Sequence, residues 1–168
     1  MPTIIENLES KLIEEARKQI QLSGYGALTM RDLAKACGVG VGTVYNYFSS
    51  KEELVAAYLL RDWMQCVRAI EAVSAQADSP RPVALSIYEQ LLSFARRHSA
   101  IFRDASATAG FSGAFGSYHG LLRSQLAQPL RKFVGTDFAA QFLAEALLTW
   151  TMAGKEFDEI YGMLEKHF

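Results

Sequence analysis

The 168-residue chain is 50% hydrophobic and 21% charged, with a formal net charge of −1. This composition excludes an intrinsically disordered chain and gives no overall basic signal for nucleic acid. The length suits one large domain or two small ones.

Neither end of the chain resembles a membrane segment. Glu6 and Glu9 stand where a secretion signal would be apolar. The most hydrophobic late stretch, residues 138–154, is interrupted by Gln141 and Glu145 and is too short to cross a bilayer. We therefore expect a cytoplasmic protein that does not associate with membranes.

The two cysteines, Cys37 and Cys66, do not suggest a disulfide framework. Each is expected to be a small buried apolar residue, and a redox switch between them is the alternative.

The sequence predicts an all-α fold, since no segment alternates apolar and polar residues as a strand does. Thr3 and Glu6 fit a capping box that opens a first helix, and Gly24 ends it. One face of this helix is apolar at four-residue spacing, at Leu8, Leu12, Ala16 and Ile20.

Residues 28–54 contain two short apolar-periodic segments joined by a tight turn. Met30–Ala36 and Val41–Phe48 are separated by Gly38, and Thr29 is placed to cap the first segment. A helix, a glycine turn and a second helix form the arrangement that presents a helix to a DNA groove. Local charge supports this weakly, because residues 29–51 carry Arg31, Lys35 and Lys51 against Asp32 alone.

A long helix is predicted from Lys51 to about residue 75, with Ser50 and Glu53 forming a capping box at its start. Pro80 and Pro82 prevent its continuation. Further helices are expected near residues 83–97, 99–108, 113–134, 137–153 and 155–167, with Pro129 kinking or splitting the third.

The N-terminal third of the chain resembles the TetR/AcrR family of transcriptional regulators. The resemblance covers about residues 5–55 without a gap. Its matching positions are Ala16, Gly24-Tyr25, Thr29, Leu33-Ala34, Gly38-Val39, Gly42-Thr43-Val44-Tyr45, Tyr47-Phe48 and Lys51-Glu52-Glu53-Leu54.

The resemblance implies an N-terminal three-helix DNA-binding domain over residues 1–50 and a C-terminal helical effector-binding and dimerisation domain over 51–168. It also implies a homodimer that represses transcription on a palindromic operator of double-stranded DNA. A small-molecule effector would release this dimer from DNA.

DNA contacts are expected from the first turns of the second short helix, since that end enters the major groove. Gly42 lets the backbone approach closely, while Val41 and Thr43 offer methyl groups to thymine. Val44 and Phe48 should pack inward against Leu33 and Leu54. The full set of expected DNA contacts is Thr29, Arg31, Val41, Gly42, Thr43, Tyr45, Asn46, Tyr47 and Lys51.

One position departs from the family pattern. Gly40 stands where many members have serine or another polar residue. Glycine still caps a helix, at a cost of a few tenths of a kcal/mol relative to serine, but it removes one hydroxyl that could meet a phosphate.

Two adjacent amphipathic segments at the chain end predict a dimer seam. Its residues would be Phe138, Phe142, Ala146, Trp150, Phe157, Ile160, Tyr161 and Leu164, and burial in the monomer core is the alternative. An apolar or aromatic effector would be lined by Trp63, Tyr88, Phe102, Phe115, Tyr118, His119 and Trp150, unless these too are core residues.

Two other functional classes remain as alternatives. A helical enzyme is disfavoured, because no phosphate loop, nucleophile elbow or Cys/His cluster is visible. His98, His119 and His167 lack metal-ligand spacing, so neither a metal nor a cofactor is expected. The last alternative is a ligand-binding or interaction module that has lost DNA binding.

Overall fold

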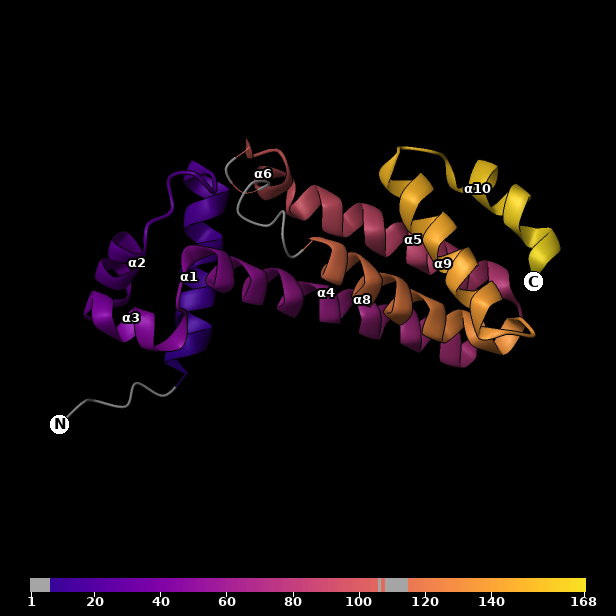
Figure 1. The fold of residues 1–168 in the computed structure, drawn as a ribbon, viewed down its shortest axis with the longest axis horizontal. Helices are drawn as coiled ribbons and strands as arrows, with labels where there is room; N and C mark the ends of the chain where they lie inside the picture. The colour runs from indigo at the N-terminus through magenta and orange to yellow at the C-terminus, as the bar shows by residue number, and fades with distance from the viewer. Residues whose placement is uncertain (1–6, 106, 108–114) are drawn as a thin grey trace. The chain divides into compact units, whose positions relative to one another are not determined.

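The computed structural model describes residues 7–105, 107 and 115–168, with the backbone alone for residues 115–117. Within this part every regular element is a helix, as the sequence predicts (Figure 1). The first four α-helices are α1 Leu8–Ser23, α2 Met30–Cys37, α3 Val41–Tyr47 and α4 Lys51–Gln76. The others are α5 Pro80–Arg97, α6 Ser99–Phe102, α8 Phe115–Ala127, α9 Asp137–Met152 and α10 Phe157–Leu164, with 3₁₀ segments η1 Gln128–Phe133 and η2 Glu165–His167.

The described residues form two compact units, and each is discontinuous in sequence. The N-terminal unit holds the residues up to Arg61 together with those from His98 to Ala107. The C-terminal unit holds Asp62–Arg97 and the residues from Phe115 onward. The sequence predicted a single boundary after residue 50 and gave no sign that a later segment joins the first unit.

A hydrophobic core holds the N-terminal unit together. Leu12, Ala16 and Leu33 are completely buried in it, and the predicted inward residues Val44 and Phe48 join them. Ile101 and Ala107 of the later segment are buried in the same core. The four-residue spacing of α1 therefore predicted its buried face correctly.

Capping interactions set the bounds of the short helices. Thr29 Oγ1 accepts the amide of Asp32 at 3.1 Å, so Thr29 caps α2 as predicted. Gly38 follows α2 in the left-handed conformation, at φ 70° and ψ 29°, which explains the requirement for glycine there. Gly40 begins α3 with extended backbone and no side-chain cap.

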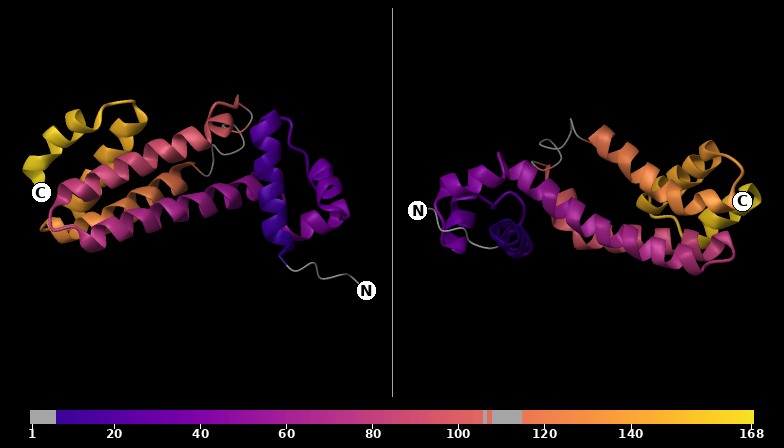
Figure 2. Two further views of the ribbon diagram at one scale, coloured as in Figure 1. Left: turned by 180° about the vertical axis from the view of Figure 1, so that it is seen from behind. Right: turned by 90° about the horizontal axis from the view of Figure 1, so that it is seen from below.

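Helix α4 runs as one continuous helix over 26 residues (Figure 2). Ser50 Oγ accepts the amide of Glu53, which is half of the predicted capping box. In the predicted box the Glu53 side chain would accept the amide of Ser50. It instead accepts hydrogen bonds from the amide and the hydroxyl of Ser49, each at 2.6 Å. These bonds lower the pKa of Glu53 below its usual value.

The C-terminal unit is built around α9, which packs against α5, α8 and α10. Ala140, Leu143 and Leu147 of α9 are completely buried, beside Ile87 of α5 and Leu130 of η1. No helix of the described residues is both long and apolar enough to cross a membrane.

Three predicted helices differ in extent. Of the segment expected at 99–108, α6 covers Ser99–Phe102, and helical backbone occurs again at Ala105 and Ala107. The segment expected at 113–134 is split as predicted, since α8 ends at Ala127 and Pro129 lies in η1. The first helix begins at Leu8, and the predicted Thr3–Glu6 box lies outside the described residues.

Candidate nucleic-acid interface

Helix α3 turns an uncharged, partly aromatic surface outward. Of its seven residues only Val44 is buried. Val41, Tyr45 and Tyr47 are 40%, 51% and 43% exposed, and Gly42 and Asn46 are exposed beside them. The exposed apolar and aromatic side chains that gather on this short helix form a candidate binding surface.

Thr29 is already engaged within its own helix. Its hydroxyl donates to the Asp32 carboxylate at 2.6 Å while accepting the Asp32 amide. Because a hydroxyl has one proton to donate, a phosphate contact from Thr29 would require this bond to break. Arg31 and Lys35, on the same helix, are exposed cations.

Lys51 is held against Tyr25, a residue to which the sequence pattern assigned no functional role. The Lys51 ammonium donates to the Tyr25 carbonyl at 3.1 Å and lies 4.1 Å from the centre of its ring. An ammonium has three donors, so two remain for other acceptors. The first residue of α4 is thereby attached to the loop between α1 and α2.

The same tyrosine bonds the next residue of α4. Tyr25 is 1% exposed, and its hydroxyl donates to Glu52 Oε1 at 3.1 Å. Burial together with the Glu52 carboxylate raises the pKa of Tyr25 to about 12. The pKa of Glu52 is lowered, first by a hydrogen bond from its own backbone amide and also by the bond from Tyr25.

The residues expected to line an effector site are distributed over both units. Trp63 is 2% exposed and donates from its indole nitrogen to Gln125 Oε1 at 2.7 Å, and Tyr88 packs on Phe157. Phe102 belongs to the N-terminal unit, whereas the other candidates belong to the C-terminal unit. Tyr118 is exposed, His119 contacts Glu145 at 2.9 Å, Trp150 is exposed, and the side chain of Phe115 lies outside the described residues.

The candidate dimer residues divide into two groups. Phe157, Ile160, Tyr161 and Leu164 are buried in the core of the C-terminal unit, as the alternative reading of this pattern anticipated. Phe138, Phe142 and Trp150 are 79%, 52% and 51% exposed on α9. Ala146 is half-buried between these groups.

An apolar groove of about 430 Å³ lies between α9 and α10. Phe142, Ala146 and Trp150 line it from α9, and Ile160, Met163 and Leu164 line it from α10. Met163, 75% exposed, was missed in the sequence because it falls outside the buried stripe of α10.

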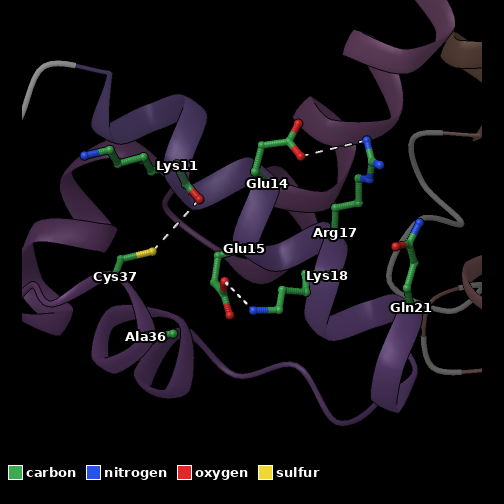
Figure 3. A pocket seen from close by; sticks show the side chains of 8 residues that line it. All are labelled: Lys11, Glu14, Glu15, Arg17, Lys18, Gln21, Ala36 and Cys37. Carbon is green, nitrogen blue, oxygen red and sulfur yellow. Dashed lines mark hydrogen bonds and ion pairs between the residues drawn. The ribbon is translucent and has the colours of Figure 1, made fainter.

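A second hollow, of about 600 Å³, lies on the N-terminal unit and is polar (Figure 3). Charged side chains of α1 line it and pair with one another, with Glu14 near Arg17 and Glu15 near Lys18. Cys37 of α2 lies at its wall, with Sγ 4.0 Å from the carbonyl oxygen of Lys11, and burial raises the pKa of its thiol. Among the described residues, no cluster of His, Cys, Asp and Glu is arranged to hold a metal ion.

Comparison with known proteins identifies the N-terminal part of the chain. Residues 12–58 match the family model described as bacterial regulatory proteins, tetR family. The transcriptional regulator UidR of Escherichia coli K12 is 31% identical over 62 residues, which are 37% of this chain and 32% of UidR. The uncharacterised regulator YhgD of Bacillus subtilis is 33% identical over 90 residues, which are 52% of this chain and 46% of YhgD. The matches thus span less than half the length of these relatives.

Solved structures extend the similarity of fold to nearly the whole chain. FadR of Thermus thermophilus, a TetR-family transcriptional repressor solved with lauroyl-CoA, aligns with a TM-score of 0.64 and 19% identity over 95% of this chain and 90% of its own. RolR with its ligand resorcinol aligns with a TM-score of 0.61 and 20% identity over 96% of this chain and 88% of its own. At this identity the alignments establish a shared fold.

Proposed function

We propose that this chain, which belongs through its N-terminal domain to the tetR family of bacterial regulatory proteins, is a sequence-specific DNA-binding transcriptional regulator. In the proposed mechanism two copies bind a palindromic operator and repress transcription. A small apolar or aromatic effector then releases them.

The outward surface of α3 is the observation that carries this proposal. Val44 anchors the helix in the core, while Val41, Tyr45 and Tyr47 remain exposed. The first amides of a helix have no partner within it and suit a phosphate or a base edge. Because α3 has no charged residue, sequence preference should come from methyl contacts to thymine, from Asn46 and Tyr45, and from DNA shape.

Phosphate contacts would supply most of the affinity and would come from neighbouring elements. Arg31 and Lys35 on α2 are exposed cations, and Lys51 retains two free donors while it bonds Tyr25. With so few cations, one N-terminal unit alone would bind DNA weakly. Two such units joined in a dimer would bind a repeated DNA site with much higher avidity.

The exposed face of α9 and α10 supports a homodimer. Helix α9 is apolar on both sides, because Leu143 and Leu147 face the core while Phe138 and Phe142 face outward. A helix that is hydrophobic all round is normally buried. A second copy with the same face would cover both, and a twofold dimer of this kind matches a palindromic operator.

A small-molecule effector is proposed from the solved proteins of the same fold and from the aromatic residues of the C-terminal unit. Two proteins of the same fold were solved with resorcinol and with lauroyl-CoA. The C-terminal unit of this chain has an aromatic interior that includes Trp63, Phe94 and Tyr88. These features favour a ligand with an aromatic ring or an acyl chain.

Selection from random DNA tests the proposed function. The full-length protein should retain duplexes that share a palindromic motif, and the variant Tyr45→Ala should retain few. Recovery of duplexes without a common motif would reject sequence-specific regulation, and recovery of none would reject DNA as the partner.

A further inference from the structure

The loop between α1 and α2 is held by a residue that lies 78 positions later in the chain. Asp104 Oδ2 accepts the backbone amide of Gly26 at 3.2 Å, and Asp104 Oδ1 accepts the amide of Ala107 at 3.2 Å. One carboxylate therefore connects the α1–α2 loop to the segment that follows α6.

This segment is itself fixed to the N-terminal unit. Ile101 and Ala107 are 2% and 1% exposed in the core that also contains Leu12 and Val44. The ring of His98 meets the ring of Tyr58 edge-on, with 4.9 Å between centroids. Since Ile101 and Ala107, three positions to either side of Asp104, are buried, the carboxylate of Asp104 offers the Gly26 amide a fixed acceptor.

The loop that Asp104 holds contacts both helices that flank α3 in the chain, α2 and α4. Tyr25, beside Gly26, bonds Lys51 and Glu52 at the start of α4. Thr29, three residues after Gly26, caps α2. Helix α3 lies in the chain between α2 and α4, so the position of this loop bears on both ends of the element that would read DNA.

We propose that Asp104 is a positioning residue for DNA recognition, which acts by fixing the Tyr25–Thr29 loop and thereby the pair α2–α3. The inference rests on the proposed function, because it assigns Asp104 a part in DNA binding without contact to DNA. By this inference, the segment that contains Asp104 contributes to DNA binding by the N-terminal unit.

The direction in which DNA affinity changes when Asp104 is replaced distinguishes a positioning role from a purely electrostatic one. Asp104 is an anion in a unit that would bind a polyanion, so removing its charge should by Coulomb attraction alone leave DNA affinity unchanged or raise it. Positioning predicts the opposite. Loss of a hydrogen bond to a charged acceptor at a partly exposed site should weaken DNA binding roughly three- to tenfold.

The experiment compares Asp104→Ala and Asp104→Asn with wild type and with the matched control Glu9→Gln, an exposed carboxylate in the first turn of α1. The probe is the tightest duplex that wild type selects from random DNA. We expect weaker binding for Asp104→Ala, a smaller loss for Asp104→Asn, no loss for Glu9→Gln, and an unchanged salt dependence in all four proteins. Asparagine keeps one acceptor oxygen and supplies a folded comparison if alanine lowers the unfolding temperature strongly.

Hydrogen exchange of the free proteins supplies the second readout and needs no DNA. The Gly26 amide should exchange roughly tenfold faster in Asp104→Ala, while the core amides of α9 should not change. Equal or tighter DNA binding by Asp104→Ala, or an unchanged Gly26 exchange rate, would overturn the inference. If wild type selects no duplex, the proposed function is rejected. The hydrogen-exchange rate of the Gly26 amide then tests separately whether Asp104 holds the α1–α2 loop, and an unchanged rate in Asp104→Ala would reject that as well.

Discussion

The Lys51 ammonium bonds the Tyr25 carbonyl at 3.1 Å and lies over the ring of the same residue, at 4.1 Å from its centre. One cation thus connects the start of α4 to the loop between α1 and α2. Both contacts lie within the N-terminal unit, beside the helix that would read DNA.

Replacing Lys51 should therefore have two separable effects. Lys51→Met removes the cation–π contact and the bond to the carbonyl, and should lower the free energy of unfolding by about 1–2 kcal/mol. If Lys51 also meets phosphate, the slope of log K against log salt should lose roughly 0.9 for each subunit. Denaturant unfolding and salt titration measure the two effects independently.

Lys35→Met is the matched control, because Lys35 is an exposed cation on α2. Its unfolding free energy should stay within about 0.5 kcal/mol of wild type. Equal stability of the Lys51 and Lys35 variants would show that the contact with Tyr25 stabilises nothing.

Neighbouring residues of α3 should respond in opposite ways. Val44 is completely buried and Tyr45 is 51% exposed. Tyr45→Ala should leave the unfolding free energy within about 0.5 kcal/mol of wild type but weaken binding to the selected duplex tenfold or more, roughly. Val44→Ala should lower the unfolding free energy by about 2 kcal/mol or more through the cavity it leaves.

Leu22→Ala gives the control for loss of an exposed apolar side chain, since Leu22 is 75% exposed on α1. It should alter neither quantity. A Tyr45→Ala protein that binds DNA as well as Leu22→Ala does would remove Tyr45 from the recognition surface.

The Tyr25–Glu52 bond should give stability a defined dependence on pH. The pKa of Tyr25 rises from 10.0 to about 12 on folding, so neutral Tyr25 contributes stability that is complete below pH 10 and is lost as pH rises towards 12. The pKa of Glu52 is lowered, so its contribution is present above the ordinary glutamate pKa and is lost as pH falls through the folded value.

Tyr25→Phe isolates the hydroxyl, because the ring beneath Lys51 remains. The difference in unfolding free energy between wild type and Tyr25→Phe should be constant near neutral pH and should shrink above pH 10. Denaturant unfolding of both proteins along the pH series measures it. A difference that stays constant through pH 12 would mean that the hydroxyl is not held as described.

Charge on the outward face of α9 should prevent association. Phe142→Glu places a carboxylate at a 52% exposed position in the groove between α9 and α10. At micromolar concentration we expect sedimentation to show a folded monomer for this variant and a dimer for wild type. The unfolding temperature of the variant should equal that of wild type diluted until it is monomeric. Leu22→Glu, at an exposed site on the other unit, should remain dimeric. A Phe142→Glu protein that sediments as wild type does would place the interface elsewhere.

Local patterns in the sequence predicted much of the structure of the N-terminal unit. Thr29, Gly38 and Gly40 fixed the bounds of α2 and α3, because capping depends on residues a few positions apart. Helical spacing likewise assigned Val44 and Phe48 to the core. The break at Pro129 followed from its missing amide.

Long-range relationships could not be obtained in this way. Periodicity marks a face as apolar without naming what covers it, so Phe157 and Tyr161 were assigned to a dimer seam although the monomer core buries them. The bond between Asp104 and Gly26 joins residues 78 positions apart, and neither residue belongs to a recognisable pattern. For the same reason, the sequence did not predict that the segment beginning at His98 belongs to the N-terminal unit.

Salt titration of binding to the selected duplex tests the central claim, DNA recognition by α3, most directly. With wild-type protein we predict that log K falls linearly with log salt with a slope of about −3 or steeper, and that Tyr45→Ala shifts the line downward without changing its slope. A flat line for wild type, or equal affinity for the selected duplex and a scrambled duplex at every salt concentration, would contradict the account.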